Sequence, residues 1–457
     1  MREITKKLIE AVKADLVPSL GVTEPGAIAF AAACAARALG GEPVTVGVWL
    51  NSGIYKNSFS CAVPGTDGMG CALAAAMGAV CGIPELGLSA LRNASEEDVI
   101  KAKLLVGSGA ARAYLESISP KISILAEVTT EKGKAEARIA GRHDRLVSLK
   151  ENGKETLTGA EELLEEAEGF KVSSVKFADI VSAVYEAVKL DKLETAHGED
   201  CIEVDSRPGT EKIDFFDIAV DLDMELFREG KRCGLMPMTE ARTGGFEDDC
   251  KTARELAEML TCGAIEARVR GAARPAMAIT GSGSHGILCM LPIHAAAVKD
   301  GFGKDEERKA LLLSALVTKY IKELSGLLST ACGCVLAGGT GAALGLTYLY
   351  STRDGVSPAV LEERLCASLS FMAASLTGMI CHGGNPGCSL KAAAGVNMAF
   401  SACEMALHGV KAEPAHGIVG ITPEETMLNM GLVAEGMLPV EKTIIDIMSC
   451  KTEQGLL

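Results

Sequence analysis

The 457-residue sequence is poor in aromatic residues and in positive charge. Phe, Trp and Tyr make up 4% of it, whereas hydrophobic residues make up 48%. The core must therefore be built mainly from Ala, Leu, Val, Ile and Met, a composition that favours closely packed, Ala- and Gly-rich helices. Lys and Arg number 45 against 60 Asp and Glu, which leaves a net charge of −15. Because a phosphate backbone is bound by clustered Lys and Arg, this balance argues against nucleic acid as a partner.

An N-terminal signal peptide and a clean membrane span are also missing. Residues 1–21 (MREITKKLIEAVKADLVPSLG) alternate charged and apolar residues at helical spacing, which indicates a cytoplasmic protein. Residues 324–352 carry no formal charge and are long enough to cross a bilayer, but they are crowded with Gly, Ser, Thr and Cys. We therefore predict buried helices that meet at the Gly-Gly-Thr-Gly run, with no membrane as partner.

Cysteine, in contrast, is abundant, with 16 residues spread along the chain. Without a secretory context these cysteines do not indicate a disulfide framework, and in a reducing compartment they are free thiols or metal ligands. Most of them are expected to be ordinary small core residues, and a few are candidates for metal binding.

Hydrophobic periodicity predicts an N-terminal α/β part over residues 1–117. Residues 2–16 have the spacing of an amphipathic helix, and a second helix is bounded by Thr23 as N-cap and Gly40-Gly41 as its end. Alternation over 43–50 predicts a strand. Residues 56–70 predict a short strand, a turn and the entry to another helix.

The pattern of the sequence changes from about residue 118, where alternating runs begin. Residues 118–158 contain three alternating runs separated by EKGK and ENGK, which are turn sequences, and predict a small antiparallel β unit. After an acidic helix in GAEELLEEAEG, the rest of 159–457 is expected to be almost entirely helical. The predicted fold class is thus α+β, predominantly helical.

Three glycine-rich segments in the helical part are candidate binding loops: GSGSHG at 281–286, CGCVLAGGTG at 332–341 and CHGGNPGC at 381–388. Glycine lets backbone N–H groups converge on an anion at a helix start, so a small carboxylate substrate is expected there. The alternative is that the glycines only let Ala-rich helices pack closely. In the first segment the candidate substrate contacts are Ser282, Ser284 and Gly286.

The cysteines of these loops suggest a metal site. Cys381 and Cys388 flank a glycine and proline bend, and a third thiol is available from Cys332 or Cys334. Three thiolates can hold an iron–sulfur cluster and leave one iron open to substrate. The C-x6-C spacing is not a standard ferredoxin or zinc pattern, so spacing alone leaves buried structural cysteines as an equal alternative and gives no support to structural zinc.

Several segments, taken in this order, resemble the L-cysteine desulfidase family, which is distantly similar to the catalytic α-subunit of iron–sulfur L-serine dehydratases. They are GVTEP at 21–25, KN at 56–57, VPGT at 63–66, GSGSHGI at 281–287, LSTACGC at 328–334 and GMICHGGNPGCSLK at 378–391. The resemblance runs over nearly the full length. It implies a serine-dehydratase-alpha-like helical domain with a small β insertion, and a [4Fe-4S] cluster. The implied ligands are Cys332, Cys381 and Cys388, Cys332 being preferred to Cys334 because it fits the LS-x-x-C pattern.

The resemblance implies a lyase that works without PLP and eliminates the β-substituent of a small L-amino acid. L-cysteine, which would give sulfide, ammonia and pyruvate, is favoured over L-serine. Glu24, Lys56 and Asn57, from the matching segments, are candidate substrate contacts. Ala- and Gly-rich helical surfaces are often buried against a second subunit, so a homodimer is a further prediction.

One residue departs from the desulfidase pattern in a way that affects the chemistry. The family has a cysteine, thought to act as the base, where this chain has Val22, and valine cannot accept a proton. Cys61, His285 and His382 are the candidate replacements, each with a structural alternative as a buried thiol, a loop histidine or a neighbour that tunes the cluster. A changed substrate, or a non-catalytic protein that binds a cluster or a ligand, also remains open.

Cys450 near the C-terminus is a separate candidate. In related serine dehydratases a C-terminal cysteine can occupy the open iron until substrate displaces it. Cys450 is not the last residue, so an ordinary helix-face thiol is the favoured interpretation.

Overall fold

The computed structural model describes residues 2–158, 169–187, 215–245 and 247–453. Its strands are β1 (Val17–Leu20), β2 (Thr45–Asn51), β3 (Ala111–Ser117), β4 (Ser123–Thr130), β5 (Gly133–Ala140), β6 (Leu146–Glu151), β7 (Lys154–Thr158) and β8 (Pro275–Ala278). Its helices in the N-terminal part are α1 (Glu3–Asp15), α2 (Thr23–Leu39), α3 (Ser52–Ser58), α4 (Cys71–Cys81), η1 (Pro84–Ser89) and α5 (Glu96–Gly107).

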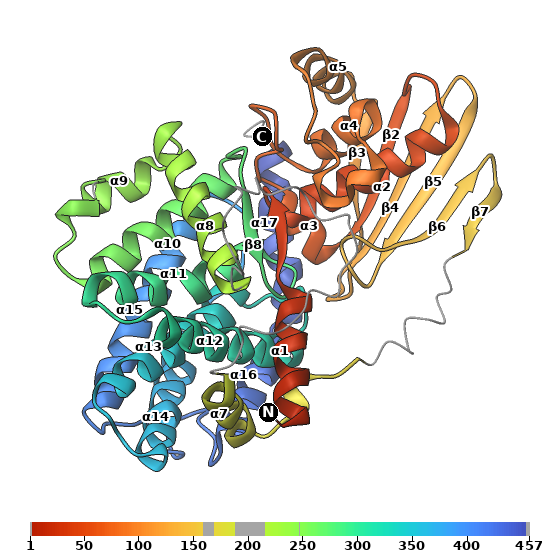
Figure 1. Ribbon diagram of the computed structural model, residues 1–457. Coiled ribbons are helices and arrows are strands. Elements are labelled where there is room, and N and C mark those ends of the chain that lie inside the picture. The colour runs from red at the N-terminus through yellow and green to blue at the C-terminus, as the bar shows by residue number, and fades with distance from the viewer. Residues whose placement is uncertain (1, 159–168, 188–214, 246, 454–457) are drawn as a thin grey trace.

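The remaining described helices form the larger part of the molecule (Figure 1). They are η2 (Val172–Ser174), α7 (Phe177–Glu186), α8 (Phe215–Arg232), α9 (Pro237–Thr243), η4 (Glu247–Asp249), α10 (Ala253–Val269), α11 (Gly283–Asp300), α12 (Lys304–Ser325), η5 (Cys334–Gly339), α13 (Thr340–Arg353), α14 (Pro358–Leu376), α15 (Gly387–Leu407), α16 (Pro423–Gly436) and α17 (Leu438–Glu453). The predicted fold class, α+β and predominantly helical, is confirmed. The predicted acidic helix falls on 159–168, outside the described residues.

A six-stranded mixed sheet forms the N-terminal part, in the order β3-β2-β4-β5-β6-β7 with only the β2 and β3 pair parallel. Alternate residues of β4 are buried, which is the pattern of a sheet with one covered face. Helices α2 and α4 lie across that face (Figure 1). They approach closely because Gly78 of α4 has no side chain: a Cβ there would lie 2.2 Å from the carbonyl oxygen of Ala29.

The structure corrects the strand predictions in two places. Residues 118–158 hold four strands rather than three, and β4 pairs with β2, so the sheet continues across residue 118. Lys56 lies in helix α3, and the expected strand at 56–70 is reduced to an isolated bridge between Ala62 and Met69. The division of the chain at residues 117 and 158 stays a prediction.

The helical part has its own core, built around α10, α11, α12, α13 and α15. The glycines at 338, 339 and 341 do not break the helix as expected: η5 runs directly into α13. Gly341 instead permits close packing on α12, since a Cβ there would lie 2.4 Å from the carbonyl oxygen of Ser314. No helix in the described part of the chain has the length and apolar character needed to cross a bilayer.

Contacts between elements far apart in the chain join the parts of the molecule, among them those of α1 with α7 and α12. Strand β1 pairs antiparallel with β8, which precedes α11, and α17 returns to pack on α3 (Figure 1). The segments that carried the family resemblance therefore meet where the N-terminal part faces the helical core.

Candidate active site

Two segments that are distant in the sequence bring the candidate ligand thiols together. An isolated antiparallel bridge joins them. Within it the N–H of Cys332 donates to Met379 O at 2.7 Å, and the N–H of Cys381 donates to Thr330 O at 2.7 Å. The backbones of Cys332 and Cys381 are therefore held side by side.

All four loop cysteines line one cavity of about 80 Å³. Cys334 is the first residue of η5, and Cys388 lies in the first turn of α15. Both helices begin shortly after the segments that form the bridge. The assignment of Cys332, Cys381 and Cys388 as cluster ligands stays a prediction. Cys332 and Cys334 both face the cavity, and the choice between them as third ligand stays a prediction.

The bend between Cys381 and Cys388 docks on the end of α3. Gly383 has φ +95°, and a Cβ there would lie 2.3 Å from the carbonyl oxygen of Lys56. The N–H of Gly384 donates to Asn57 O at 3.1 Å. Glycine is required at residue 383 for two reasons, its left-handed backbone and the absence of space for a side chain.

The thiols differ in acidity because of their surroundings. A hydrogen bond with Cys334 lowers the pKa of the Cys332 thiol to about 6, although burial opposes this shift. The same hydrogen bond, with burial, raises the pKa of Cys334 well above its usual value, and burial raises that of Cys388 to about 12. Burial lowers the pKa of Lys322 to about 8, while the thiols beside it act in the opposite direction. A buried amine among four thiols is suited to balancing a negatively charged group.

The donor set fits an iron–sulfur cluster in its chemistry. Thiolates are the usual cluster ligands, and the cavity is lined by four thiols and by two buried cations, Lys322 and Arg268. Among the described residues, no three His, Cys, Asp or Glu side chains converge closely enough to bind a single metal ion. A cluster binds each thiolate through a different iron, so its ligands do not have to meet at one point.

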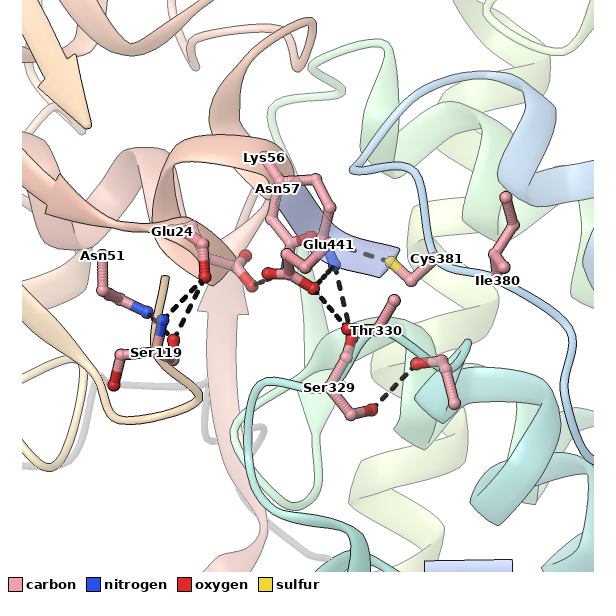
Figure 2. A network of polar contacts seen from close by, with 12 residues as sticks. Glu24, Asn51, Lys56, Asn57, Ser119, Ser329, Thr330, Ile380, Cys381 and Glu441 are labelled. Atoms are coloured by element: carbon pink, nitrogen blue, oxygen red, sulfur yellow. Dashed lines mark hydrogen bonds and ion pairs between the residues drawn. The ribbon is translucent and has the colours of Figure 1, made fainter. Parts of the chain in front are cut away.

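Two predicted substrate contacts, Glu24 and Asn57, line the same cavity. The Asn57 amide donates to Glu24 Oε1 at 2.7 Å and accepts from the Cys381 thiol at 3.7 Å, so the three side chains form a chain (Figure 2). This chain connects the start of α2 to the thiols. Their contact with substrate stays a prediction.

Lys56 has a structural position instead of the predicted one at the substrate. Its amine forms a buried ion pair with Glu441 Oε2 at 2.9 Å and donates to Ser329 O at 3.3 Å (Figure 2). Thr330 donates its hydroxyl to the same carboxylate at 2.7 Å. Lys56 does not line the cavity, and its pair with Glu441 ties α17 to α3 and to the bridge segment.

His285 is buried beside the thiol segments and lines the cavity. Its Nδ1 lies 2.7 Å from Thr280 Oγ1, and that hydroxyl donates its own proton to Ile279 O at 2.7 Å. With the Thr280 hydroxyl donating to Ile279 O, Nδ1 carries the ring proton and Nε2 is the basic nitrogen. Nε2 lies 2.7 Å from where a Cβ of Gly333 would stand, between the two thiols of that segment. Burial, with the charges of Lys322 and Arg268, lowers the pKa of His285 well below its usual value.

Thr280 holds this histidine from an unusual backbone conformation. Its φ is +52°, a region that β-branched residues rarely adopt, and its N–H donates to Asp15 Oδ2 at 3.1 Å. A strained backbone conformation persists only when several neighbouring contacts hold it in place, and such conformations are frequent at functional sites.

The other predicted contacts divide into those at the cavity and those away from it. Ser282 and Ser284 line it. Gly286 does not: it packs on β8, where a Cβ would lie 1.9 Å from Met277 O. Cys61 is fully buried outside the lining, and burial raises its pKa. His382 is also outside the lining, with its Nδ1 3.0 Å from the Asn385 amide. Cys61 and His382 were predicted as bases, and the structure brings neither into the cavity.

Lys322, Arg268 and His143 line the cavity and were among the residues that sequence reasoning missed. Arg268 ends α10, where it has the pattern of an ordinary cation in the last helical turn. His143 lies in the turn between β5 and β6, a charged GRHDR sequence, yet it is buried and its Nε2 has no partner. The chain has only seven histidines, and this scarcity was the one sequence feature that could have drawn attention to His143. Nothing in the sequence singles out Arg268.

Val22 and Cys450 were also singled out in the sequence, and the structure shows where each lies relative to the cavity. Val22 lines the cavity at the start of α2, so the position that departs from the desulfidase pattern lies within the site. Cys450 is exposed on α17 and does not line the cavity, which agrees with the interpretation as a helix-face thiol.

Comparison with known proteins places this site in a family. The profile of the serine dehydratase alpha chain matches residues 119–446. The chain is 35% identical over 447 residues to a UPF0597 protein of Clostridium botulinum strain Langeland, covering 96% of this chain and 98% of that protein. It is 32% identical over 453 residues to a UPF0597 protein of Caldanaerobacter subterraneus subsp. tengcongensis, covering 98% and 99%. It is also 32% identical over 452 residues to a UPF0597 protein of Clostridioides difficile strain 630, covering 96% and 99%.

The matched family is generally associated with iron–sulfur clusters and suggests a lyase or deaminase. The match covers the bridge segment, the bend with its thiols and the loop of His285. With the thiols, the buried cations and the glycine bend in one cavity, the chain belongs to the serine dehydratase alpha chain family and is similar over its whole length to UPF0597 proteins.

Proposed function

We propose that this protein is an iron–sulfur-dependent lyase that eliminates the β-substituent of a small L-amino acid without PLP. The observation that supports this most is the single cavity lined by four thiols, Lys322, His285 and Glu24. L-cysteine, which gives sulfide, ammonia and pyruvate, is the favoured substrate because of the resemblance to desulfidases. L-serine, with water as leaving group, is the alternative.

Cys332, Cys381 and Cys388 would hold a [4Fe-4S] cluster in this cavity. When bound by three thiolates, such a cluster supplies a Lewis-acidic iron with an open position. The pKa of Cys332, lowered to about 6 by its hydrogen bond with Cys334, favours the thiolate form that metal binding needs. Lys322 would balance negative charge on the thiolates, because it is buried beside them and forms no ion pair with the described residues.

Glu24 is suited to bind the substrate's α-ammonium group. It is mostly buried at the start of α2, and Asn57 holds one of its oxygens by a hydrogen bond. An ammonium group beside a buried carboxylate makes a charge-assisted hydrogen bond, which is stronger than one between neutral groups.

His285 is suited to remove the α-proton. Its Nε2 carries the free lone pair, and its depressed pKa keeps the imidazole neutral near pH 7. The electron pair of the broken C–H bond forms the Cα–Cβ double bond, and the β-substituent leaves with its bonding electrons, as hydrosulfide or as hydroxide that takes up a proton to become water. The enamine that results then hydrolyses to a 2-oxo acid and ammonia. Cys61 is less suited, because burial raises its pKa and it lies outside the cavity.

A non-catalytic cluster-binding protein is the second candidate, and Val22 is the observation that favours it. Valine occupies the cavity wall where relatives in the desulfidase family carry their proposed base. In that case the chain would bind an amino acid without turnover.

A turnover assay separates the two candidates. Anaerobically prepared protein is incubated with L-cysteine or L-serine, and sulfide, ammonia and pyruvate are quantified. Pyruvate with equimolar sulfide would establish the desulfidase, and pyruvate from L-serine alone would establish a dehydratase. A loaded protein that binds either amino acid and releases no pyruvate would contradict the lyase proposal.

A further inference from the structure

Arg268 is a buried cation with no anionic partner among the described residues. It is 2% exposed and lines the cavity. One guanidinium nitrogen donates to Ser284 Oγ at 3.0 Å and another to Thr23 Oγ1 at 3.4 Å, while Nε has no hydrogen-bond partner. Guanidinium groups cannot lose their charge by deprotonation in proteins, so a buried one needs a compensating anion.

The neighbouring carboxyl groups do not supply that anion. Asp223 forms no ion pair with Arg268: its Oδ1 accepts from the Met277 N–H at 2.9 Å, its Oδ2 has no hydrogen-bond partner, and burial raises its pKa well above the usual value, which disfavours the charged form. Glu24 gives one of its oxygens to the Asn57 amide and forms no ion pair with Arg268. Within the described residues, the charge of Arg268 is thus met only by hydroxyl groups.

Two helix starts add to the positive potential around Arg268. Thr23 is the first residue of α2, which has 17 residues, and Ser284 lies in the first turn of α11, which has 18. Neither helix has a side-chain cap at its N-terminus. The positive ends of both helix dipoles and their uncapped N–H groups therefore lie beside the same guanidinium, an arrangement that binds carboxylates and phosphates.

We propose that Arg268, with the Ser284 hydroxyl and the start of α11, is the subsite for the substrate's α-carboxylate. This inference rests on the proposed function, and it specifies which groups of the substrate the residues of the cavity bind. Arg268 takes the carboxylate, Glu24 takes the ammonium group, and the thiol-lined end of the cavity receives the β-substituent. Recognition at three points accounts for selection of an α-amino acid over a simple amine or thiol.

Lys322, the other buried cation among the described residues that line the cavity, does not compete for this role. It lies among the thiols of Cys332, Cys334 and Cys381, whereas Arg268 is hydrogen-bonded to hydroxyl groups. The two cations are therefore suited to two different anions, the cluster with its thiolates and the substrate.

Two analogues of L-cysteine test the subsite without turnover. 3-Mercaptopropionate keeps the thiol and the carboxylate but lacks the amine, and cysteamine keeps the thiol and the amine but lacks the carboxylate. Their affinities are measured by calorimetry on the anaerobically reconstituted full chain, with iron per chain determined on each sample. The variants are Arg268→Gln and Arg268→Lys. Arg270→Gln is the matched control, since Arg270 lies on the same helix end and pairs with Glu266 outside the cavity.

We expect Arg268→Gln to bind 3-mercaptopropionate about 10- to 100-fold more weakly than the parent, because a charge-assisted hydrogen bond is lost. Cysteamine affinity and iron content should stay unchanged, Arg268→Lys should recover part of the loss, and Arg270→Gln should behave as the parent. If Arg268→Gln does not fold, Ser284→Ala serves instead, with a weaker loss confined to 3-mercaptopropionate.

Three results would overturn the subsite: unchanged affinity for 3-mercaptopropionate in a folded variant, equal losses for both analogues, or a loss of iron in place of a loss of affinity. The last would mean that Arg268 balances the cluster's charge. Failure of the lyase proposal is distinguishable, because carboxylate-dependent binding through Arg268 would then persist in a protein that forms no pyruvate.

Discussion

His285 is the single residue on which the proposed proton transfer depends. We predict that His285→Gln lowers kcat by about 10²- to 10⁴-fold, the usual contribution of a general base, while iron per chain is retained. Because the neutral imidazole is the active form and its pKa is lowered, the acid limb of kcat/KM should lie below the ordinary histidine value of about 6.5. Activity should therefore persist as the pH falls through the ordinary histidine value, and be lost only at more acidic pH.

The measurement is a pH profile of kcat/KM with the substrate that turns over. His408→Gln is the control, because His408 is exposed and its ring contacts only the preceding helical turn, at Glu404 O. An acid limb unchanged in position and height in His285→Gln would show that another group takes the proton.

The choice between Cys332 and Cys334 is also a question about single residues. We predict that Cys332→Ser loses most of its iron and labile sulfide after anaerobic reconstitution, because it removes a thiolate ligand. Cys334→Ser should retain both, although the pKa of the Cys332 thiol would rise without the Cys334 hydrogen bond. Cys450→Ser, on an exposed helix face, is the control. Loss of iron in Cys334→Ser with retention in Cys332→Ser would reverse the assignment.

Single residues also mark the limit of what the sequence could predict. The thiols, Glu24, Asn57 and His285 were found because they lie in segments that resemble a family. Arg268 and His143 were missed because their burial depends on elements far away in the chain, which no local pattern encodes. The buried ion pair of Lys56 was not predicted for the same reason: its partner, Glu441, is 385 residues further on.

Between elements, the buried pair of Lys56 and Glu441 connects α3, α17 and the bridge segment. Their side chains are 1% and 3% exposed. We predict that Glu441→Gln lowers the free energy of unfolding by about 3–5 kcal/mol, because it leaves Lys56 buried without an anion. Denaturant unfolding of the cluster-free protein measures this. Asp446→Asn on the same helix removes an exposed pair with Lys442 and should cost at most about 0.5 kcal/mol. Equal effects of the two substitutions would contradict a structural role for the buried pair.

Element prediction succeeded where a local signal was strong. Helices α1 and α2 and strand β2 follow from periodicity, and the turns EKGK and ENGK mark real hairpins. Element prediction failed where tertiary contacts determine the secondary structure. Residues 56–58 complete α3, which the bend at Gly383 packs against. Gly338 and Gly339 stay helical, and at Gly338 the reason for glycine is close packing, because a Cβ there would lie 3.1 Å from His285 O.

For the whole molecule, the cavity lies where the N-terminal part meets the helical core. Val22, Glu24 and Asn57 come from the first, and the thiols, His285 and Arg268 come from the second. The fold class could be predicted from composition and periodicity. The way in which β1, β8 and α17 bring the two parts together could not, because these contacts join segments hundreds of residues apart.

The most direct test of the central claim is the iron and labile sulfide content of the anaerobically reconstituted protein. We predict about four irons and four sulfides per chain, the content of one [4Fe-4S] cluster, and their loss when Cys381 and Cys388 are both replaced by serine. A folded parent protein that retains no iron after reconstitution, or a double variant that retains all of it, would contradict the assignment of this cavity as a cluster site.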